Sequence, residues 1–571
     1  MKTTVQKEKT SETKKSFLNL SPEEKISLGI LVIILIVIAS IRSKFSGIGF
    51  ERDEGAYSYY GKLLLEGKTP YVDFYEQKFP GIFYFYGLMV GLFGFTVKGL
   101  HMGFMLLNMA SVILIYFAAR KLFNPFAAII AATTYAFVSL TPNLSGFTIQ
   151  SEHGVAFFIS LGMLFFALYN DKRKWLHLFL MGISFGMAFM IKTNGVFLVL
   201  WGGGTLILNY VFDKNRSVKQ LLINIGIYGA GGFLVILFFF ALILLKGSFN
   251  EMMFWAYEVP KNYVGKIKYE DGVKYFGYTR DAIVENYKFF WMYAILGVFV
   301  CLLKSISWRN KLIYVTLAFF SFMTIVPGFY FYGHYWIQLI PGLSILSALA
   351  YFGIINFLRD SMNLKQPVIK YAYLAIFFIL TIKHVSALKS YYFHPNYERI
   401  LRTVYGSNPF PETLEIANYI NANSKPEDQT AIIGSEPEFY IYTNKNYLSR
   451  HAYFAAIVAD FKQHPQWQRE YAQDVEKAKP RYLVFYNHGI SLFVQPNTDK
   501  YIFDWVNKYV AENYKIIGVA DMVDGQQTTY AWKEQLNGFQ PKGQNVIYIY
   551  ERNTTTPQQA AAPANATEPV K

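Results

Sequence analysis

The sequence is poor in charge and almost free of cysteine. Only 16% of its 571 residues are charged, whereas a soluble protein of this length carries about a quarter. The single cysteine, Cys301, excludes a disulfide within the chain, a site of several thiolate ligands and a CxxC redox centre. With 53% hydrophobic residues in long uncharged runs, this composition excludes a disordered, fibrous or ordinary cytosolic protein and indicates a polytopic membrane protein.

The charge that is present is unbalanced. Lysine and arginine number 54 against 39 acidic residues, which gives a net charge of +15. In a membrane protein such an excess usually gathers in cytoplasmic loops. The basic balance therefore does not imply a nucleic-acid partner, and none is expected.

The first membrane span is marked on both sides. Residues 1–25 are polar and rich in lysine, and Ser21-Pro22-Glu23-Glu24 is typical of a helix start. Residues 26–41 are apolar and lie between Lys25 and Arg42, and no small-residue cleavage site follows them. The pattern predicts a retained anchor whose N-terminal side, 1–25, lies in the cytoplasm.

Further uncharged runs follow along the chain. The run 312–358 is too long for one span and is broken at Pro327-Gly328, which predicts a hairpin of two spans. The runs are 80–97, 99–119, 122–150, 153–170, 175–191, 193–212, 220–245, 289–303, 312–358 and a weaker one at 368–385.

Short basic clusters decide which runs cross. Clusters at 120–121, 172–174, 214–219, 304–311 and 359–370 all fall in the cytoplasm only if 80–97 does not cross. That glycine-rich run is therefore predicted to be a helix on the outer face. The result is a mainly α membrane protein of about eleven spans, 26–387, with an outer loop at 43–98 that carries interfacial helices.

The chain after residue 387 has ordinary polar content. Strand-like segments at 429–435, 481–487, 515–519 and 545–550 alternate with helical ones at 411–424, 457–478 and 502–514. This order predicts a small α/β domain over 388–552 on the extracytoplasmic side, and 553–571 is predicted to be a disordered tail. The domain has no glycine-rich phosphate loop, and the chain has no HExxH metal motif.

Ionisable residues gather in the loops predicted on the outer face. Loops of a membrane protein often carry solvated acids that only cap helices, but here four separate loops bring such groups to one side while the span interiors hold almost none. Transporters more often place ionisable residues at the middle of the membrane. The candidates are Arg52, Asp53, Glu54, Lys78, Glu152, His153, Lys192, His334 and Tyr335.

The order of these features resembles the GT-C membrane glycosyltransferases, in the branch of the protein O-mannosyltransferases and aminoarabinose transferases. The resemblance covers residues 26–386. The family's first-loop Asp matches Asp53, and its second-loop acid matches Glu152, which is Glu where the family has Asp. Gln77-Lys78-Phe79-Pro80 departs from the family's Glu-Lys-Pro-Pro at two positions, and Tyr335-Trp336 opens a segment similar to its aromatic loop before a Leu-x-Pro start.

The resemblance implies an enzyme that transfers a sugar, with inversion, from a polyprenyl-phosphate donor at the outer face. Asp53 is the predicted base, with Glu54 and Glu152 as further catalytic carboxylates. Lys78, Lys192, His334 and Arg52 are candidates for the leaving phosphate, and His153 and Tyr335 for substrate binding. A divalent metal held near the family's Glu in some relatives stays open here. The expected location is the bacterial inner membrane.

Other interpretations stay open at this stage. Lys192 could be an interfacial anchor, Lys78 a helix flank, and His153 and His334 local hydrogen-bonding residues. The whole protein could be a transporter or flippase of lipid-linked glycan precursors, or a noncatalytic scaffold whose outer domain binds a partner. The sequence does not choose among glycan, lipid and protein acceptors, nor does it assign a role to the C-terminal domain.

Overall fold

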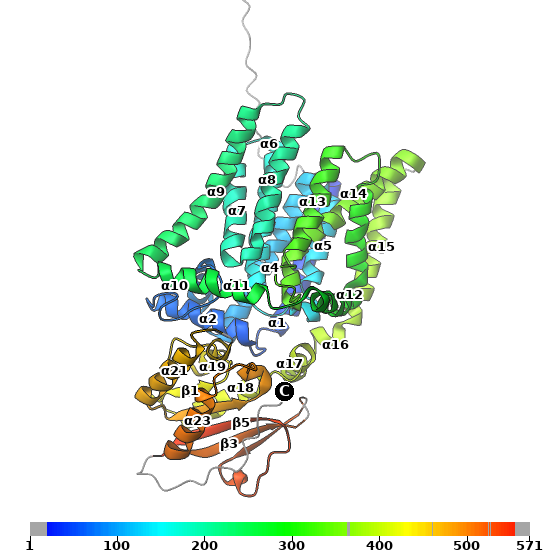
Figure 1. Ribbon diagram of the computed structural model, residues 1–571. Helices are drawn as coiled ribbons and strands as arrows, with labels where there is room; N and C mark the ends of the chain where they lie inside the picture. The colour runs from blue at the N-terminus through cyan, green and yellow to red at the C-terminus, as the bar shows by residue number, and fades with distance from the viewer. Residues whose placement is uncertain (1–19, 363–365, 460, 524, 526, 554–571) are drawn as a thin grey trace, which may run out of the picture.

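The computed structural model describes residues 20–362, 366–459, 461–523, 525 and 527–553. The predicted polar N-terminus up to residue 19 and the predicted tail from residue 554 lie outside these ranges. The chain forms a layer of roughly aligned helices with a smaller α/β domain attached to one end (Figure 1). This is the predicted fold class.

Three helices define the end of the layer that faces away from the α/β domain. Helix α1 (Pro22–Lys44) begins at Ser21 with the predicted capping box, in which Ser21 and Glu24 each bond the other's backbone. Arg120 near the end of α4 (Val97–Leu122) pairs with Glu24, and Lys370 in α15 (Gln366–Ala387) lies 3.0 Å from Glu23. Helices α1 and α15 therefore start on one face, where α4 ends.

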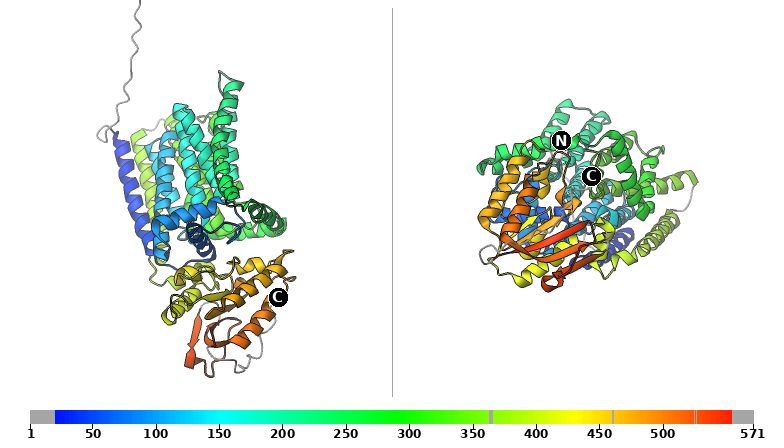
Figure 2. Two further views of the ribbon diagram at one scale, coloured as in Figure 1. Left: turned by 90° about the vertical axis from the view of Figure 1, so that its left-hand side faces the viewer. Right: turned by 60° about the horizontal axis from the view of Figure 1, so that its bottom comes forward.

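The opposite end of the layer holds two helices that lie across the others. Helix α2 (Arg52–Leu65) and helix α3 (Gly81–Phe93) follow α1 and precede α4, so α3 begins and ends on the same face (Figure 2). A side chain at Gly61 would lie 2.7 Å from the backbone carbon of Tyr86, so the two helices touch through a glycine. Helix α3 thus lies across one end of the layer, and its position at the membrane interface stays a prediction.

The remaining helices complete the layer. Helix α12 (Tyr269–Val300) bends by 108° between Tyr269–Glu285 and Tyr287–Val300, and only its second part runs along the layer. Short helical segments α10 (Phe249–Met253), η4 (Phe254–Glu258) and α11 (Val259–Val264) precede it. The other long helices are α5 (Pro125–Val138), α6 (Ser151–Lys172), α7 (Trp175–Ile191), α8 (Val196–Val211), α9 (Val218–Leu245), α13 (Trp308–Met323) and α14 (Ile340–Met362).

The multi-pass architecture agrees with the composition. Among the described residues, seven helices are long and apolar enough to cross a membrane, or eight if the bent α12 counts as one span. Helices α5 and α7 are apolar but shorter. A membrane protein of many helices is therefore confirmed, while the count of eleven spans stays a prediction.

The C-terminal domain contains a five-stranded mixed sheet with strand order β1-β2-β5-β3-β4. Strand β1 (Thr430–Ile433) pairs parallel to β2 (Tyr482–Asn487), while β5 (Asn545–Arg552) runs antiparallel to β2 and to β3 (Tyr514–Met522). Strand β4 (Thr528–Trp532), an edge strand, was not predicted because its short polar segment shows no hydrophobic alternation. The helices of the domain are α18 (Phe410–Asn423), α19 (Phe439–Thr443), α20 (Phe454–Val458), α21 (His464–Ala478), α22 (Gly489–Leu492) and α23 (Tyr501–Asn513).

A short connection places this domain beside α2. Helices α16 (Lys389–Tyr392) and α17 (Tyr397–Tyr405) follow α15, and Tyr397 donates its hydroxyl to the carbonyl of Lys44 at 2.8 Å. The α/β domain therefore lies at the end of the layer where α1 finishes and α2 begins. The predicted site loops and the C-terminal domain share one face.

Candidate active site

A cavity of about 1230 Å³ lies between the helical layer and the C-terminal domain. Its walls come from α2, the loop before α3, the starts of α6 and η3 (Thr193–Gly195), the segment before α14, and the C-terminal domain. Seven of the nine predicted residues line it, namely Arg52, Asp53, Lys78, Glu152, Lys192, His334 and Tyr335. The tertiary structure thus brings together loops that are far apart in the sequence.

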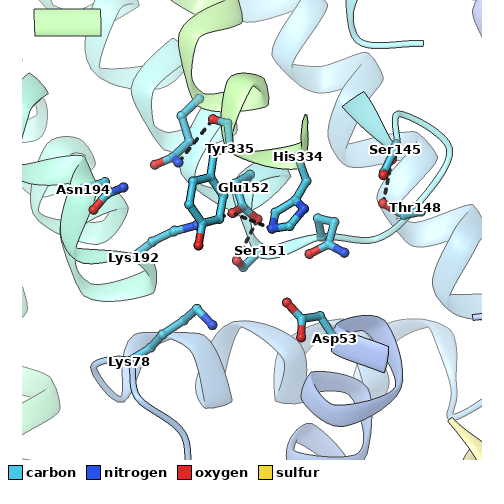
Figure 3. A network of polar contacts seen from close by, with 12 residues as sticks. Asp53, Lys78, Ser145, Thr148, Ser151, Glu152, Lys192, Asn194, His334 and Tyr335 are labelled. Atoms are coloured by element: carbon cyan, nitrogen blue, oxygen red, sulfur yellow. Dashed lines mark hydrogen bonds and ion pairs between the residues drawn. The ribbon is translucent and has the colours of Figure 1, made fainter. Parts of the chain in front are cut away.

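Glu152 is the centre of one wall. It lies in the first turn of α6 and is 1% exposed, so its charge needs a partner. The Lys192 ammonium donates to its Oε1, the His334 Nε2 lies 3.9 Å from the same oxygen, and Ser151 donates to Oε2 at 2.9 Å. Figure 3 shows this group meeting above the cavity.

Local structure explains how Lys192 and Tyr335 reach this wall. Lys192 caps the C-terminus of α7, where a cation is favourable, and its ammonium lies 3.5 Å from the centre of the Tyr335 ring. Tyr335 belongs to the 3₁₀ segment η5 (Gly333–Leu339). A side chain at Gly333 would lie 2.0 Å from the carbonyl oxygen of Asn143, so this close approach requires glycine.

Asp53 faces the same space from the other wall. It lies in the first turn of α2, where the positive end of the helix dipole favours a carboxylate. Its Oδ2 accepts a hydrogen bond of 3.2 Å from Tyr57, and its Oδ1 accepts one of 3.2 Å from Tyr453 of the C-terminal domain. In Figure 3 Asp53 and Lys78 lie opposite the Glu152 group.

Lys78 is connected to Asp53 through one tyrosine. Its ammonium donates to the Tyr57 hydroxyl, lies 4.5 Å from the centre of that ring, and lies 3.4 Å from Oε1 of Glu76. Burial lowers the pKa of Lys78, but the carboxylates of Glu76, Asp53 and Glu152 outweigh it, so the pKa lies above its usual value. The neighbouring carboxylates therefore favour the charged form of Lys78.

Three predicted residues do not direct a free polar group into the cavity. Glu54 does not line the cavity; its Oε2 accepts from the backbone of Glu51 and its Oε1 from the backbone of Ile149. His153 is 2% exposed and also lies outside the cavity lining, and neither ring nitrogen has a hydrogen-bond partner among the described residues. Arg52 reaches the cavity edge, but its guanidinium is bonded to the C-terminal domain at Glu436.

Many residues of the cavity are not predicted from the sequence, and four of them carry side chains that bond or neighbour the predicted ones. Tyr57 could have been found, because it follows Asp53 by four positions on the same helix face. Glu51 directly precedes Arg52 and Glu76 lies two positions before Lys78, and the burial that raises the pKa of Glu51 is not visible in the sequence. Tyr453 carries no local signal, because it meets Asp53 across 400 positions.

The carboxylates do not form a metal site by themselves. Within the described ranges no group of three or more His, Cys, Asp or Glu side chains could hold a metal ion. Glu152 is already neutralised by Lys192, and Asp53 is bonded by two tyrosines. These donors do not fit a metal held by protein ligands alone, and the lysine and arginine side chains that line the cavity are Arg52, Lys78, Lys192 and Lys266.

The Glu152–Lys192 pair makes a stability prediction. Replacing Lys192 with Met leaves a buried carboxylate without its cation, which we expect to lower the free energy of unfolding by about 3–5 kcal/mol. Adding Glu152→Gln removes the unpaired charge, so the double variant is expected to recover most of the loss in a thermal melt of the detergent-solubilised protein. Lys98→Met, at an exposed lysine of α4, is the control. A Lys192→Met variant that melts at the same temperature as the wild type would contradict the pairing of Lys192 with Glu152.

Comparisons with known proteins show what the chain is similar to. A family model described as dolichyl-phosphate-mannose-protein mannosyltransferase matches residues 77–244. No curated protein matches the sequence.

Solved structures share the architecture at low identity. ArnT from Cupriavidus metallidurans, bound to undecaprenyl phosphate, is 13% identical, with 80% of this chain and 93% of that chain covered and a TM-score of 0.52. The oligosaccharyltransferase of Archaeoglobus fulgidus is also 13% identical. Its structure in complex with Zn and sulfate has a TM-score of 0.51, with 88% of this chain and 73% of that chain covered. Its structure tethered to an acceptor peptide has a TM-score of 0.50, with 89% of this chain and 74% of that chain covered. The chain is built on the fold of the GT-C membrane glycosyltransferases.

Proposed function

We propose that the protein transfers a sugar from a polyprenyl-phosphate donor to an acceptor hydroxyl, with inversion, at the extracytoplasmic face of the membrane. The observation that carries the proposal is the placement of the Asp53 carboxylate opposite two lysines in one cavity at the edge of the helical layer. The fold shared with ArnT, whose structure holds undecaprenyl phosphate, supports the class of donor.

The two lysines are suited to a leaving phosphate. Each ammonium is a compact charge with three donors, and each lies in a buried or half-buried position where its field is weakly screened. Lys78 and Lys192 come from different walls, so a phosphate between them would be held from two sides. His334 adds a third nitrogen beside Lys192. Glu152, another predicted catalytic carboxylate, orients Lys192 through its Oε1.

The reaction is a single displacement. Asp53 accepts the hydrogen bond of an acceptor hydroxyl and directs its oxygen at the anomeric carbon of the sugar. The bond from that carbon to the phosphate oxygen breaks as the bond to the acceptor oxygen forms, so the configuration inverts. The acceptor proton passes to Asp53, and the charge that develops on the leaving phosphate is met by Lys78 and Lys192.

The position of the site favours transfer over transport. Transporters bind their substrates near the middle of the membrane, at helices broken there. Here the cavity lies where α2 and the C-terminal domain cover the end of the layer. A donor anchored in the outer leaflet would present its phosphate at this depth, while its acceptor would arrive from the aqueous side.

The Asp53→Asn variant keeps the shape of the side chain and removes its basicity. We expect it to insert and fold normally but to lower transfer at least 100-fold, because a general base typically contributes that much. Mass spectrometry of surface glycans in cells that carry wild type, the variant or no copy would measure the loss. Asp73→Asn, at an exposed aspartate of the same loop, is the control. Full product formation with Asp53→Asn removes Asp53 from the mechanism.

Phosphate recognition can be tested without the sugar. Undecaprenyl phosphate should raise the melting temperature of the wild type, and Lys78→Gln should weaken its apparent affinity about tenfold or more, since a charge-assisted contact is lost. Lys98→Gln serves as the matched control, and undecaprenol, which lacks the phosphate, should give no shift. Equal affinities of wild type and Lys78→Gln would place the phosphate elsewhere.

The side of the membrane is open to a direct test. Alkaline phosphatase fused after residue 400 should be active, because this reporter folds outside the cytoplasm and the C-terminal domain is proposed to lie there. The same reporter fused after Lys174, between α6 and α7, should be inactive. The reverse pattern would put the site in the cytoplasm and would exclude a donor of the outer leaflet.

A further inference from the structure

One loop of the C-terminal domain enters the proposed active site. Residues 444–453, here named the docking loop, connect α19 to α20. At its start, the backbone N–H of Tyr447 donates to the Tyr59 hydroxyl of α2 at 2.9 Å. At its end, Tyr453 lines the cavity and donates its hydroxyl to Asp53.

The docking loop also reaches the segment that carries Lys78. The Tyr75 hydroxyl lies 2.7 Å from Nδ1 of His451, and the Tyr75 ring stacks on Trp255 with 3.7 Å between ring centres. Tyr75 is three residues before Lys78. His451 and Tyr453 therefore touch the two parts of the outer loop that hold the base and the phosphate-facing lysine.

Contacts outside the docking loop also hold the C-terminal domain against α2. Arg52 donates to the carbonyl of Ser435 at 2.5 Å and pairs with Glu436 at 3.1 Å. All three residues are buried. A side chain at Gly55 would lie 2.4 Å from the backbone nitrogen of Glu438, so α2 and the C-terminal domain are in contact at the backbone. The domain is packed against the very turn that carries Asp53.

Asp53 is thus held by one tyrosine from each domain. Tyr57, from its own helix, donates to Oδ2, and Tyr453 donates to Oδ1, each at 3.2 Å. Two donors on two oxygens fix the plane of a carboxylate, whereas one leaves it free to rotate about the bond to its Cβ. Each oxygen keeps a further lone-pair position for an acceptor hydroxyl.

We infer that the C-terminal domain completes the active site, with Tyr453 as a positioning residue that orients the Asp53 carboxylate. The inference rests on the proposed function and assigns the domain a part in it. Tyr453 acts through Asp53, so its hydroxyl governs the rate of transfer and not the binding of the lipid donor. Transfer accordingly requires the domain in its docked position.

The test compares two single-hydroxyl deletions. Tyr453→Phe removes the bond to Asp53, while Tyr397→Phe removes a bond between the same two domains, to the Lys44 carbonyl, outside the cavity lining. Membrane vesicles are titrated with the lipid-linked sugar fraction of the same cells, and the glycan product is measured by mass spectrometry. We expect Tyr453→Phe to lower the maximal rate about tenfold with an unchanged half-saturating donor concentration, and Tyr397→Phe to leave both unchanged.

A backbone variant separates docking from the hydroxyl itself. Gly55→Ala would force α2 and Glu438 apart while Tyr453 is intact, and we expect it to lower the maximal rate as well. Gly91→Ala, in α3 where an added carbon meets only an ordinary contact at 3.8 Å, is its control. Melting temperatures and the shift produced by undecaprenyl phosphate should match the wild type for Tyr453→Phe, which excludes simple unfolding.

The outcomes distinguish this inference from the proposed function. A wild-type rate with Tyr453→Phe overturns the inference, as does an equal loss with Tyr397→Phe, because the hydroxyls would then only attach the domain. A changed half-saturating concentration at constant maximal rate also overturns it and makes Tyr453 a donor-binding residue. A wild-type protein that shows no transfer at all overturns the proposed function and this inference together.

Discussion

A buried carboxylate must be met by a cation, and this requirement at Glu152 organises the helical half of the cavity. Glu152 starts α6, Lys192 ends α7, and His334 lies in the segment that leads into α14. Their pairing ties three helices together at one end of the layer. Loss of one partner would leave a charge in a place with little water, so stability and chemistry depend on the same contact.

The other half of the cavity is formed where α2 packs against the C-terminal domain. Helix α2 lies along the end of the layer, with its first turn against the C-terminal domain and its later turns against α3. Asp53 lies in this first turn and receives one hydrogen bond from each side. The site is therefore a junction between domains, and the helix start that presents the carboxylate also joins them.

The sequence predicted the parts of the site whose signals are local. Asp53, Lys78, Glu152, Lys192 and His334 were found because charge is conspicuous next to long apolar runs, and the distribution of lysine and arginine placed them on one face. Glu54 and His153, which follow Asp53 and Glu152 directly along the chain, do not line the cavity. On a helix, adjacent side chains point about 100° apart, so a neighbour in sequence can face the scaffold.

By itself the sequence determined the membrane class, the order of the helices, the capped start of α1 and the α/β character of the C-terminal domain. These follow from hydrophobic period, helix caps and charge, which depend on residues only a few positions apart. Only the tertiary structure decided that Arg52 joins the domains, that Glu54 supports a backbone, and that Tyr453 bonds to Asp53. Such contacts arise from close packing between segments hundreds of residues apart, and no local pattern records them.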